Sequence, residues 1–375
     1  GSLFVLFSGF YLVSVSLRIS FIPNASPVYF VGVVGTIFYL LIRVLLTPSS
    51  VKLNGTMVLA FVSILYFSVN QFVLQGDLNM TINVILCFLF FFIVSDTLKN
   101  SSIASLIRIS ELFILFSTSL LMIETILRIV SIGSPIPYLM SMISGGYEFY
   151  LLKRGSIMFA DSNSTAFFAS VVFLFIDYIS AKSGKSYLFQ RLVLLLVILF
   201  AFSRAAIIAL AVTLFIAFVF SKISNKGLLL LIPVLIVLAA VLISPISRYI
   251  LSDASFGTKL FVVERTIDYT KSSSFAVILL GVGFGGGRRL LGIWLHNLFI
   301  TYYVETGIIG LCIFLGFMLS VLRSTRWRAI YLILFLSIIG FSFVPYAIPY
   351  LFVVFALMSI LERRKFRKVT ENMND

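Results

Sequence analysis

The feature that most constrains this chain is the recurrence of apolar stretches of roughly 16 to 22 residues along its 375-residue length. Wound as an α-helix, each stretch matches the ~30 Å hydrocarbon core of a bilayer. Since 61% of the residues are hydrophobic and only 11% are charged, too little polar surface exists to cover a soluble globule. The alternating apolar and polar pattern of a transmembrane β-barrel is absent from the sequence. The sequence therefore predicts an all-α polytopic integral membrane protein.

We interpret the apolar stretches as about twelve transmembrane helices in a single transmembrane domain over residues 1–375. Their expected ranges are 3–17, 28–46, 56–74, 79–96, 111–131, 157–179, 188–202, 204–221, 227–243, 296–322, 329–344 and 347–361. Two long connections, 132–156 and 244–295, are expected to be loops on the outer side that form the functional face.

Basic residues fall in alternate connections, which predicts the orientation of the chain. One side carries Lys52, Lys99, Arg108, Lys182, Lys185, Arg191, Lys222, Lys226, Arg323, Arg326, Arg328 and the tail 363–368. By the positive-inside rule this side and both termini are cytoplasmic. Six further basic residues lie in the connection 244–295 although positive charge there opposes the rule. An anion bound at the outer leaflet would explain this outward excess better than nucleic acid, for which we expect no role.

The sequence predicts neither a disulfide framework nor a metal site. Cys87 and Cys312 both lie inside apolar stretches. The chain contains no Asp-x-Asp, the kind of carboxylate cluster that holds Mg²⁺ or Mn²⁺ in many transferases. We therefore expect a mechanism without a metal and without a cofactor.

His296 is the only histidine and begins an apolar segment after a loop rich in glycine and arginine. A continuous helix would place five residues on one stripe: His296, Ile300, Tyr303, Gly307 and Gly310. The two glycines would let a neighbouring helix approach this stripe closely. Glu305 would point about half a turn away and meet a different neighbour. The histidine is either a group for proton chemistry or an anchor at the lipid interface.

Two further features suggest anion binding. Arg204 stands between apolar residues, where it would either bind phosphate with its guanidinium fork or extend to the outer interface. Residues 281–289 read Gly-Val-Gly-Phe-Gly-Gly-Gly-Arg-Arg, but no Gly-Lys-Ser/Thr follows, so we expect no nucleotide site. A flexible backbone beside Arg288, Arg289 and His296 is the simpler interpretation.

These segments resemble the superfamily of bacterial O-antigen ligases and Wzy-type polysaccharide polymerases. His296-Asn297, nine residues, then Gly307-x-x-Gly310 is similar to its His-Asn/Ser/Gln-x9-Gly-x-x-Gly motif. Residues 280–285 resemble its Gly-x-Gly-Phe-Gly stretch, and Ser203-Arg204-Ala205 resembles its membrane-embedded Ser-Arg-small motif. Residues 154–163 resemble its Arg-x-x-Gly-x-Phe-x-Asp-Pro-Asn segment, with Ser162 in place of the proline. The likeness covers most of residues 150–310.

One pattern of the family is missing. The Arg-x10-Gly spacing of some Wzy-type polymerases fails from both Arg154 and Arg265, where Thr165 and Ala276 stand in place of glycine.

The resemblance implies a fold like the C-type glycosyltransferases and a metal-independent polymerase at the outer face of a bacterial inner membrane. A growing glycan would pass from undecaprenyl diphosphate to the terminal hydroxyl of a lipid-linked repeat unit. The implied catalytic residues are His296 as the base, Asn297 to orient the histidine or a sugar, and Glu305, which would equally serve to brace helices. The implied diphosphate-binding residues are Arg204 and Arg265, then Arg288, Arg289 and Arg154. The implied substrate-binding residues are Asp161, Asn163 and Tyr303.

The resemblance implies three partners: an undecaprenyl-diphosphate-linked oligosaccharide, the lipid bilayer and, where chain length is not set by the polymerase itself, a chain-length regulator protein. Two alternatives stay open. An O-antigen ligase would use the same donor and transfer the glycan to lipid A-core. A flippase for lipid-linked oligosaccharide would also have about twelve spans, although the two halves of this sequence show no repeat.

Overall fold

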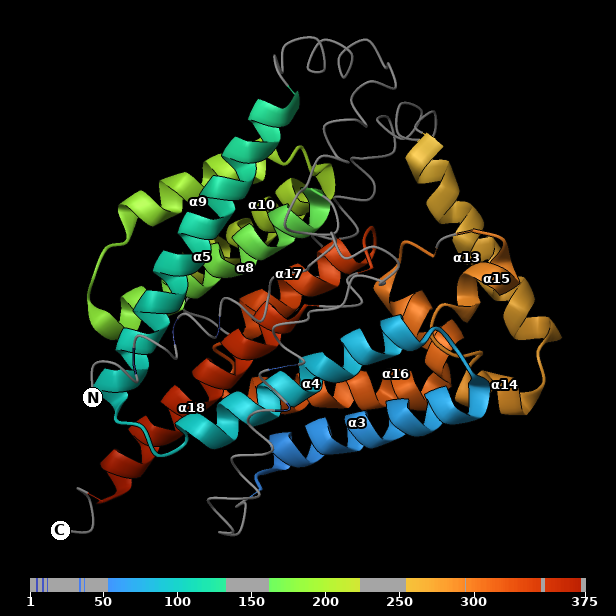
Figure 1. Ribbon diagram of the computed structural model, residues 1–375, viewed down its shortest axis with the longest axis horizontal. Helices are drawn as coiled ribbons and strands as arrows, with labels where there is room; N and C mark the ends of the chain where they lie inside the picture. The colour runs from blue at the N-terminus through green and yellow to red at the C-terminus, as the bar shows by residue number, and fades with distance from the viewer. Residues whose placement is uncertain are drawn as a thin grey trace.

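The computed structural model describes residues 53–132, 162–222, 254–293, 295–344 and 348–371, with the isolated residues 5, 9, 12, 34 and 37. Within these residues the chain forms twelve helices and no strand (Figure 1). Six helices are long and apolar enough to cross a membrane: α3 (Gly55–Leu74), α4 (Leu78–Leu98), α5 (Ile103–Ile132), α8 (Ser162–Ser183), α10 (Arg204–Lys222) and α16 (Leu298–Ser324). The predicted all-helical, membrane-type fold is confirmed for the described residues.

The remaining helices differ from the predicted spans in length or place. The helices α9 (Leu188–Phe200), α17 (Ile330–Gly340) and α18 (Pro349–Glu371) occupy predicted spans, but the first two are short. The helices α13 (Ala254–Ser272), α14 (Phe275–Leu280) and α15 (Gly286–Leu291) lie inside the connection predicted at 244–295. The twelve described helices are thus not the twelve predicted spans. The predicted spans 3–17, 28–46 and 227–243 fall outside the described residues, apart from isolated positions, as does nearly all of the connection 132–156.

The helices form two groups joined by α17 and α18. One group has α3 between α4 and α16, and the other contains α5, α8, α9 and α10 (Figure 1). The helix α18 packs against α4, α5, α8 and α16, whereas α17 packs against α8, α10 and α16. The helix α13 and the short helices α14 and α15 cover one end of α16. This arrangement gives the bundle two dissimilar ends.

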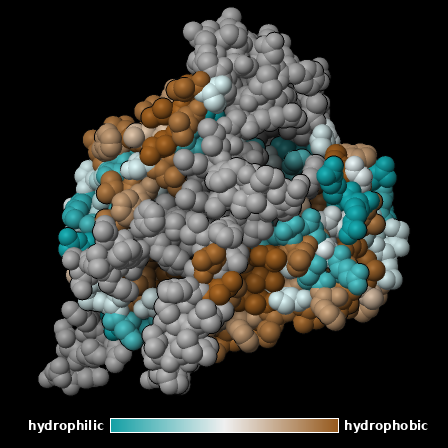
Figure 2. Space-filling model, in the orientation of Figure 1, coloured by the Kyte–Doolittle hydropathy of each residue, from teal (hydrophilic) through white to brown (hydrophobic). Residues whose placement is uncertain are grey.

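Phenylalanine rings fill the interior between the helices. Phe88 of α4 lies with its ring centroid 5.0 Å from Phe317 of α16 and 4.9 Å from Phe352 of α18. In lipid, helices associate mainly through such close packing, because lipid tails are as apolar as the side chains. Apolar side chains also cover much of the outer surface of the bundle, whereas hydrophilic ones gather over α13 and α15 (Figure 2).

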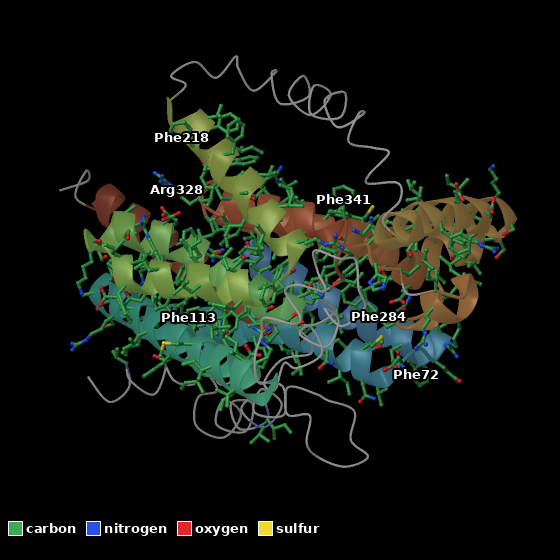
Figure 3. All side chains as sticks on the ribbon, turned by 90° about the horizontal axis from the view of Figure 1, so that it is seen from above. Phe72, Phe113, Phe218, Phe284, Arg328 and Phe341 are labelled. Carbon is green, nitrogen blue, oxygen red and sulfur yellow. The ribbon has the colours of Figure 1, made fainter. Side chains whose placement is uncertain are left out.

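Basic residues from distant parts of the chain meet at one end of the bundle. The guanidinium of Arg364 donates to the carbonyl of Lys99, and Arg363 donates to Asn54 Oδ1 at 2.9 Å. Lys182 Nζ lies 2.6 Å from Glu362 Oε1. We call this end, with the turn that follows α16, the paired end; Figure 3 shows Arg328 toward it and Phe72 and Phe284 toward the other. Among the described residues, Lys99, Lys182, Arg363 and Arg364 lie at this same end, and the assignment of this end to the cytoplasm stays a prediction.

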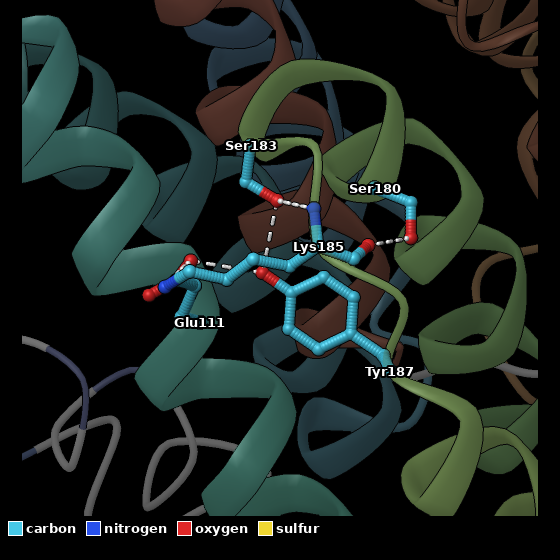
Figure 4. A network of polar contacts seen from close by, with 5 residues as sticks. All are labelled: Glu111, Ser180, Ser183, Lys185 and Tyr187. Atoms are coloured by element: carbon cyan, nitrogen blue, oxygen red, sulfur yellow. Dashed lines mark hydrogen bonds and ion pairs between the residues drawn. The ribbon is translucent and has the colours of Figure 1, made fainter.

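A polar network at the paired end ties α5 to the turn between α8 and α9 (Figure 4). Glu111 Oε1 lies 2.8 Å from Lys185 Nζ and accepts a hydrogen bond from the Tyr187 hydroxyl at 2.9 Å. Ser183 Oγ accepts from the backbone N–H of Lys185, whose carbonyl accepts from Ser180 Oγ at 2.9 Å. Desolvation by burial raises the pKa of Tyr187, and its hydroxyl donates to Glu111.

Candidate functional site

The helix α16 begins at a capped N-terminus and is broken nine residues later. Asn297 Oδ1 accepts hydrogen bonds from the backbone N–H groups of Phe299 and Ile300, both at 3.0 Å. This side-chain oxygen satisfies two of the N–H groups that a helix start leaves without partners. The regular helix is interrupted at Gly307, which has φ 68° and ψ −178°. The segment between Asn297 and Gly307 is therefore a short helix with its own two ends.

The break exposes carbonyl groups that residues from elsewhere in the chain satisfy. The carbonyls of Val304 and Glu305 accept from the backbone N–H groups of Val282 at 3.1 Å and Gly283 at 2.9 Å. The carbonyl of Thr306 accepts from the Tyr66 hydroxyl of α3 at 2.6 Å. Because a buried carbonyl without a partner costs free energy, these donors make the break stable.

The loop that supplies these donors also contacts the turn between α3 and α4. The backbone N–H of Asp77 donates to the carbonyl of Phe284 at 2.6 Å, and Asn70 Nδ2 donates to the carbonyl of Leu280 at 2.7 Å. We call the assembly of residues 281–287, 76–77 and 304–307 the glycine junction. It joins three separate parts of the chain largely through backbone atoms.

Two glycines are required at the glycine junction by their backbone angles and by space. Gly281 has φ +79°, and a Cβ built there would meet the carbonyl of Glu305 and come within 2.6 Å of Gly307 N. Gly307 has φ +68°, and its Cβ would meet the carbonyl of Leu279 and come within 2.6 Å of Leu280 N. Gly281 and Gly307 therefore serve close backbone packing, while the flexible backbone predicted for residues 281–289 stays a prediction.

The expected stripe from His296 to Gly310 is also wrong, because it assumed one continuous helix. His296 lies before the first residue of α16 and has φ +42°, and Gly307 interrupts the helix. The close approach predicted at the two glycines is confirmed. The end of α14 approaches Gly307, and the ring of Tyr66 lies 3.0 Å from a Cβ built at Gly310.

Glu305 is buried with 1% of its surface exposed and points into the glycine junction. Its Oε1 accepts a hydrogen bond from the backbone N–H of Gly287 at 3.3 Å. The carboxylate therefore contacts the start of α15, where Leu295 also packs against Gly287.

Leu295, the residue before His296, packs against the start of the arginine-bearing helix α15. A Cβ built at Gly287 would come within 2.5 Å of the side chain of Leu295, which precedes His296. Arg288 and Arg289 follow Gly287 directly, and both side chains are exposed, as is that of His296. With one oxygen of Asn297 bound to the helix, its Nδ2 amino group is the part that can orient the histidine or a ligand.

The other residues predicted on this side belong to α13 and to the second turn of α16. The guanidinium of Arg265 is exposed and lies 4.9 Å from the ring centroid of Phe261. The Tyr303 hydroxyl shares a hydrogen bond of 2.9 Å with Thr270 Oγ1, which connects α16 to α13. The structure thus brings Arg265, Arg288 and Arg289 to the same end of the bundle as His296.

Arg204 and Asn163 lie in the other helix group. Arg204 is the exposed first residue of α10, after the predicted break at Ser203, and α10 packs against α8, α9 and α17. Asn163 lies in the first turn of α8. The helix α13 packs instead against α15 and α16, so Arg204 and Arg265 stand on separate groups. Arg154 and Asp161 fall outside the described residues.

The structure also contains a buried ion pair that we did not predict as part of a site. Arg128 Nε lies 3.5 Å from Glu124 Oε1 within α5, and both side chains are at most 1% exposed. An ionisable pair inside a membrane-type helix is expensive and is a candidate for function. Its signal in the sequence is an acid and a base four residues apart within an apolar stretch.

No family model matches this chain, and no curated protein matches it significantly. Among the described residues, no three His, Cys, Asp or Glu side chains gather as they would to hold a metal ion. The fold defines an all-helical, membrane-type protein.

Proposed function

We propose that the protein is a metal-independent polysaccharide polymerase in the bacterial cytoplasmic membrane. It transfers a growing glycan from undecaprenyl diphosphate to the terminal hydroxyl of a lipid-linked repeat unit at the outer face. The observation that carries the proposal is the position of the only histidine. It is exposed, directly before the capped N-terminus of α16, and next to the arginine-bearing helix α15.

In the proposed reaction the acceptor hydroxyl attacks the anomeric carbon of the donor sugar. The new glycosidic bond forms as the bond to the diphosphate oxygen breaks, and that oxygen leaves with the electron pair. His296 Nδ1 or Nε2 takes the proton of the attacking hydroxyl, a task that suits an imidazole near neutral pH. A single displacement of this kind inverts the configuration at the anomeric carbon.

Arginines stabilise the negative charge of the leaving diphosphate in this scheme. Arg288 and Arg289 have the more direct support, because α15 packs against Leu295, the residue before His296. Arg265 lies at the same end, and Arg204 would bind the donor from the α10 side. The N-terminus of α16 also favours an anion, since its N–H groups carry partial positive charge.

The test is an elongation assay with protein in lipid nanodiscs and a labelled lipid-diphosphate repeat unit. We expect a ladder of longer products that persists in EDTA. His296→Ala and His296→Gln should each lower the initial rate by about 100-fold or more, the effect of removing a general base. Arg204→Ala and the double variant Arg288→Ala/Arg289→Ala should raise KM for the donor and lower the rate.

The matched control is Asp268→Asn, which removes an exposed charge from α13 at the same end of the bundle. This variant should keep the parent rate. A full rate in both His296 variants would remove the histidine from the mechanism. Transfer to lipid A-core without elongation would favour the ligase, and translocation of labelled lipid across a vesicle without a product would favour the flippase.

A further inference from the structure

The turn between α16 and α17 has an unusual backbone for its residues. It spans residues 325–329 and contains two consecutive non-glycine residues with positive φ, Arg326 at 51° and Trp327 at 66°. Glycine or asparagine adopts this conformation at low cost, whereas a bulky residue such as tryptophan rarely does. A strained backbone of this kind persists only where the surrounding structure holds it.

Hydrogen bonds hold the turn in this conformation. The backbone N–H of Trp327 donates to the carbonyl of Leu322 at 2.7 Å. Thr325 is fully buried, and its Oγ1 donates to the carbonyl of Val321 at 2.8 Å and accepts from Ala329 N at 3.3 Å. The turn is therefore a rigid support, and the directions of its side chains are set by the backbone.

The turn and the last residues of α16 present three arginines and a tryptophan at the surface of the paired end. The side chains of Arg323, Arg326 and Arg328 are exposed, and Trp327 is 57% exposed. Figure 3 shows Arg328 at the periphery of the bundle.

Other basic side chains at this end contact carboxylates. Lys182 is 2.6 Å from Glu362, and Arg191 NH2 is 2.8 Å from Asp177. Those pairs join helices to one another.

A short turn between two apolar helices lies at the surface of the bilayer, where the phosphates of the lipids are. Tryptophan favours this interface because its ring is apolar and its N–H is polar. Guanidinium groups bind phosphate oxygens with two parallel hydrogen bonds, and basic residues near a membrane attract anionic lipids. We propose that Arg323, Arg326, Trp327 and Arg328 form a binding site for the phosphate headgroup of an anionic phospholipid in the adjoining leaflet.

This site lies at the opposite end of α16 from His296, so the proposal does not depend on the proposed polymerase activity. In this proposal the arginines bind a specific lipid headgroup in addition to influencing the topology of the chain.

The chain contains two tryptophans, Trp294 and Trp327, which permits a direct test. The variant Trp294→Phe leaves Trp327 as the only tryptophan reporter. This protein is placed in vesicles of phosphatidylglycerol and phosphatidylcholine at one fixed ratio, with either lipid brominated on its acyl chain. We expect brominated phosphatidylglycerol to quench Trp327 at least two-fold more than brominated phosphatidylcholine at equal mole fraction.

Three further variants, each in the Trp294→Phe background, define the site. Arg323→Gln/Arg326→Gln/Arg328→Gln should bring the quenching ratio to one, and the corresponding triple lysine variant should give an intermediate ratio. The matched control Arg108→Gln removes an exposed arginine at the same end and should keep the parent ratio. A ratio of one in the parent, or an equal fall in the Arg108 control, would overturn the proposal.

Discussion

The two ends of the helix bundle are held together in different ways. At the glycine junction, backbone N–H and carbonyl groups of residues 281–284, 77 and 304–305 bind one another directly. At the paired end, long charged side chains such as Lys182 and Glu362 join helices whose backbones stay apart. Backbone contacts restrict the size of the side chains at the junction, whereas ion pairs tolerate changes when they are exposed.

This difference has a consequence for function. The backbone contacts of the glycine junction use few side-chain groups, so His296, Arg288 and Arg289 remain exposed beside it. At the paired end the structural role falls on the charged groups themselves. We therefore expect substitutions at the junction to alter both stability and activity, and substitutions at the paired end to alter mainly stability.

Gly307→Ala should have the largest effect on stability. The left-handed backbone and the contacts with Leu279 and Leu280 should together lower the free energy of unfolding by about 2–5 kcal/mol. The measurement is an unfolding titration with SDS in mixed micelles. The matched control is Gly316→Ala on the same helix, where none of the described atoms lies within 4 Å of an added Cβ. That variant should be unchanged or gain up to about 1 kcal/mol, and equal losses in both would contradict the structural role of the break.

Glu305→Ala should have the next largest effect. It removes the acceptor of the Gly287 N–H in a buried place, which should lower the free energy of unfolding by about 1–3 kcal/mol. Glu305→Gln keeps an oxygen at the same position and should restore most of the stability. If Glu305→Gln is stable but loses elongation, the carboxylate takes part in the chemistry and is more than a brace.

The ion pairs of the paired end should show smaller effects that follow their burial. Lys182→Met leaves the nearly buried Glu362 with the Tyr178 hydroxyl as its remaining partner and should cost about 1–2 kcal/mol. Lys185→Met removes a mostly exposed lysine from Glu111 and should cost at most about 1 kcal/mol. The same SDS titration compares the two, and a larger loss from Lys185→Met would show that burial does not set the strength of these pairs.

Much of the fold could be predicted from apolar length and basic residues. The ranges 56–74, 79–96 and 204–221 agree with α3, α4 and α10 to within a few residues, because a helix in lipid must satisfy its backbone internally over a fixed thickness. The span predicted at 111–131 begins eight residues earlier, at Ile103, since polar residues continue a helix beyond the apolar stretch. The helix α13 lacks a comparable length signal because charged and polar residues interrupt its apolar ones, and α14 and α15 have only six residues each.

The candidate site was predictable in its residue types and less so in its geometry. The lone histidine, two of the arginines and the glycines lie in residues 281–310, and the structure brings most of the predicted site residues to the end of the bundle that carries α13 to α15. The stripe from His296 to Gly310 failed because local periodicity assumes an unbroken helix. The sequence did not predict the buried ion pair of Glu124 and Arg128, because its burial depends on the neighbouring helices.

The sequence by itself determined that this chain forms apolar helices of membrane-spanning length and that its basic connections meet at one end. Those properties depend on local composition and on the low polarity of lipid. Only the tertiary structure decided that α16 breaks at Gly307. The carbonyls of Val304, Glu305 and Thr306 receive their hydrogen bonds from Val282, Gly283 and the distant Tyr66. A helix can stop at a glycine inside an apolar stretch only when such donors are present, and the sequence around the break does not show them.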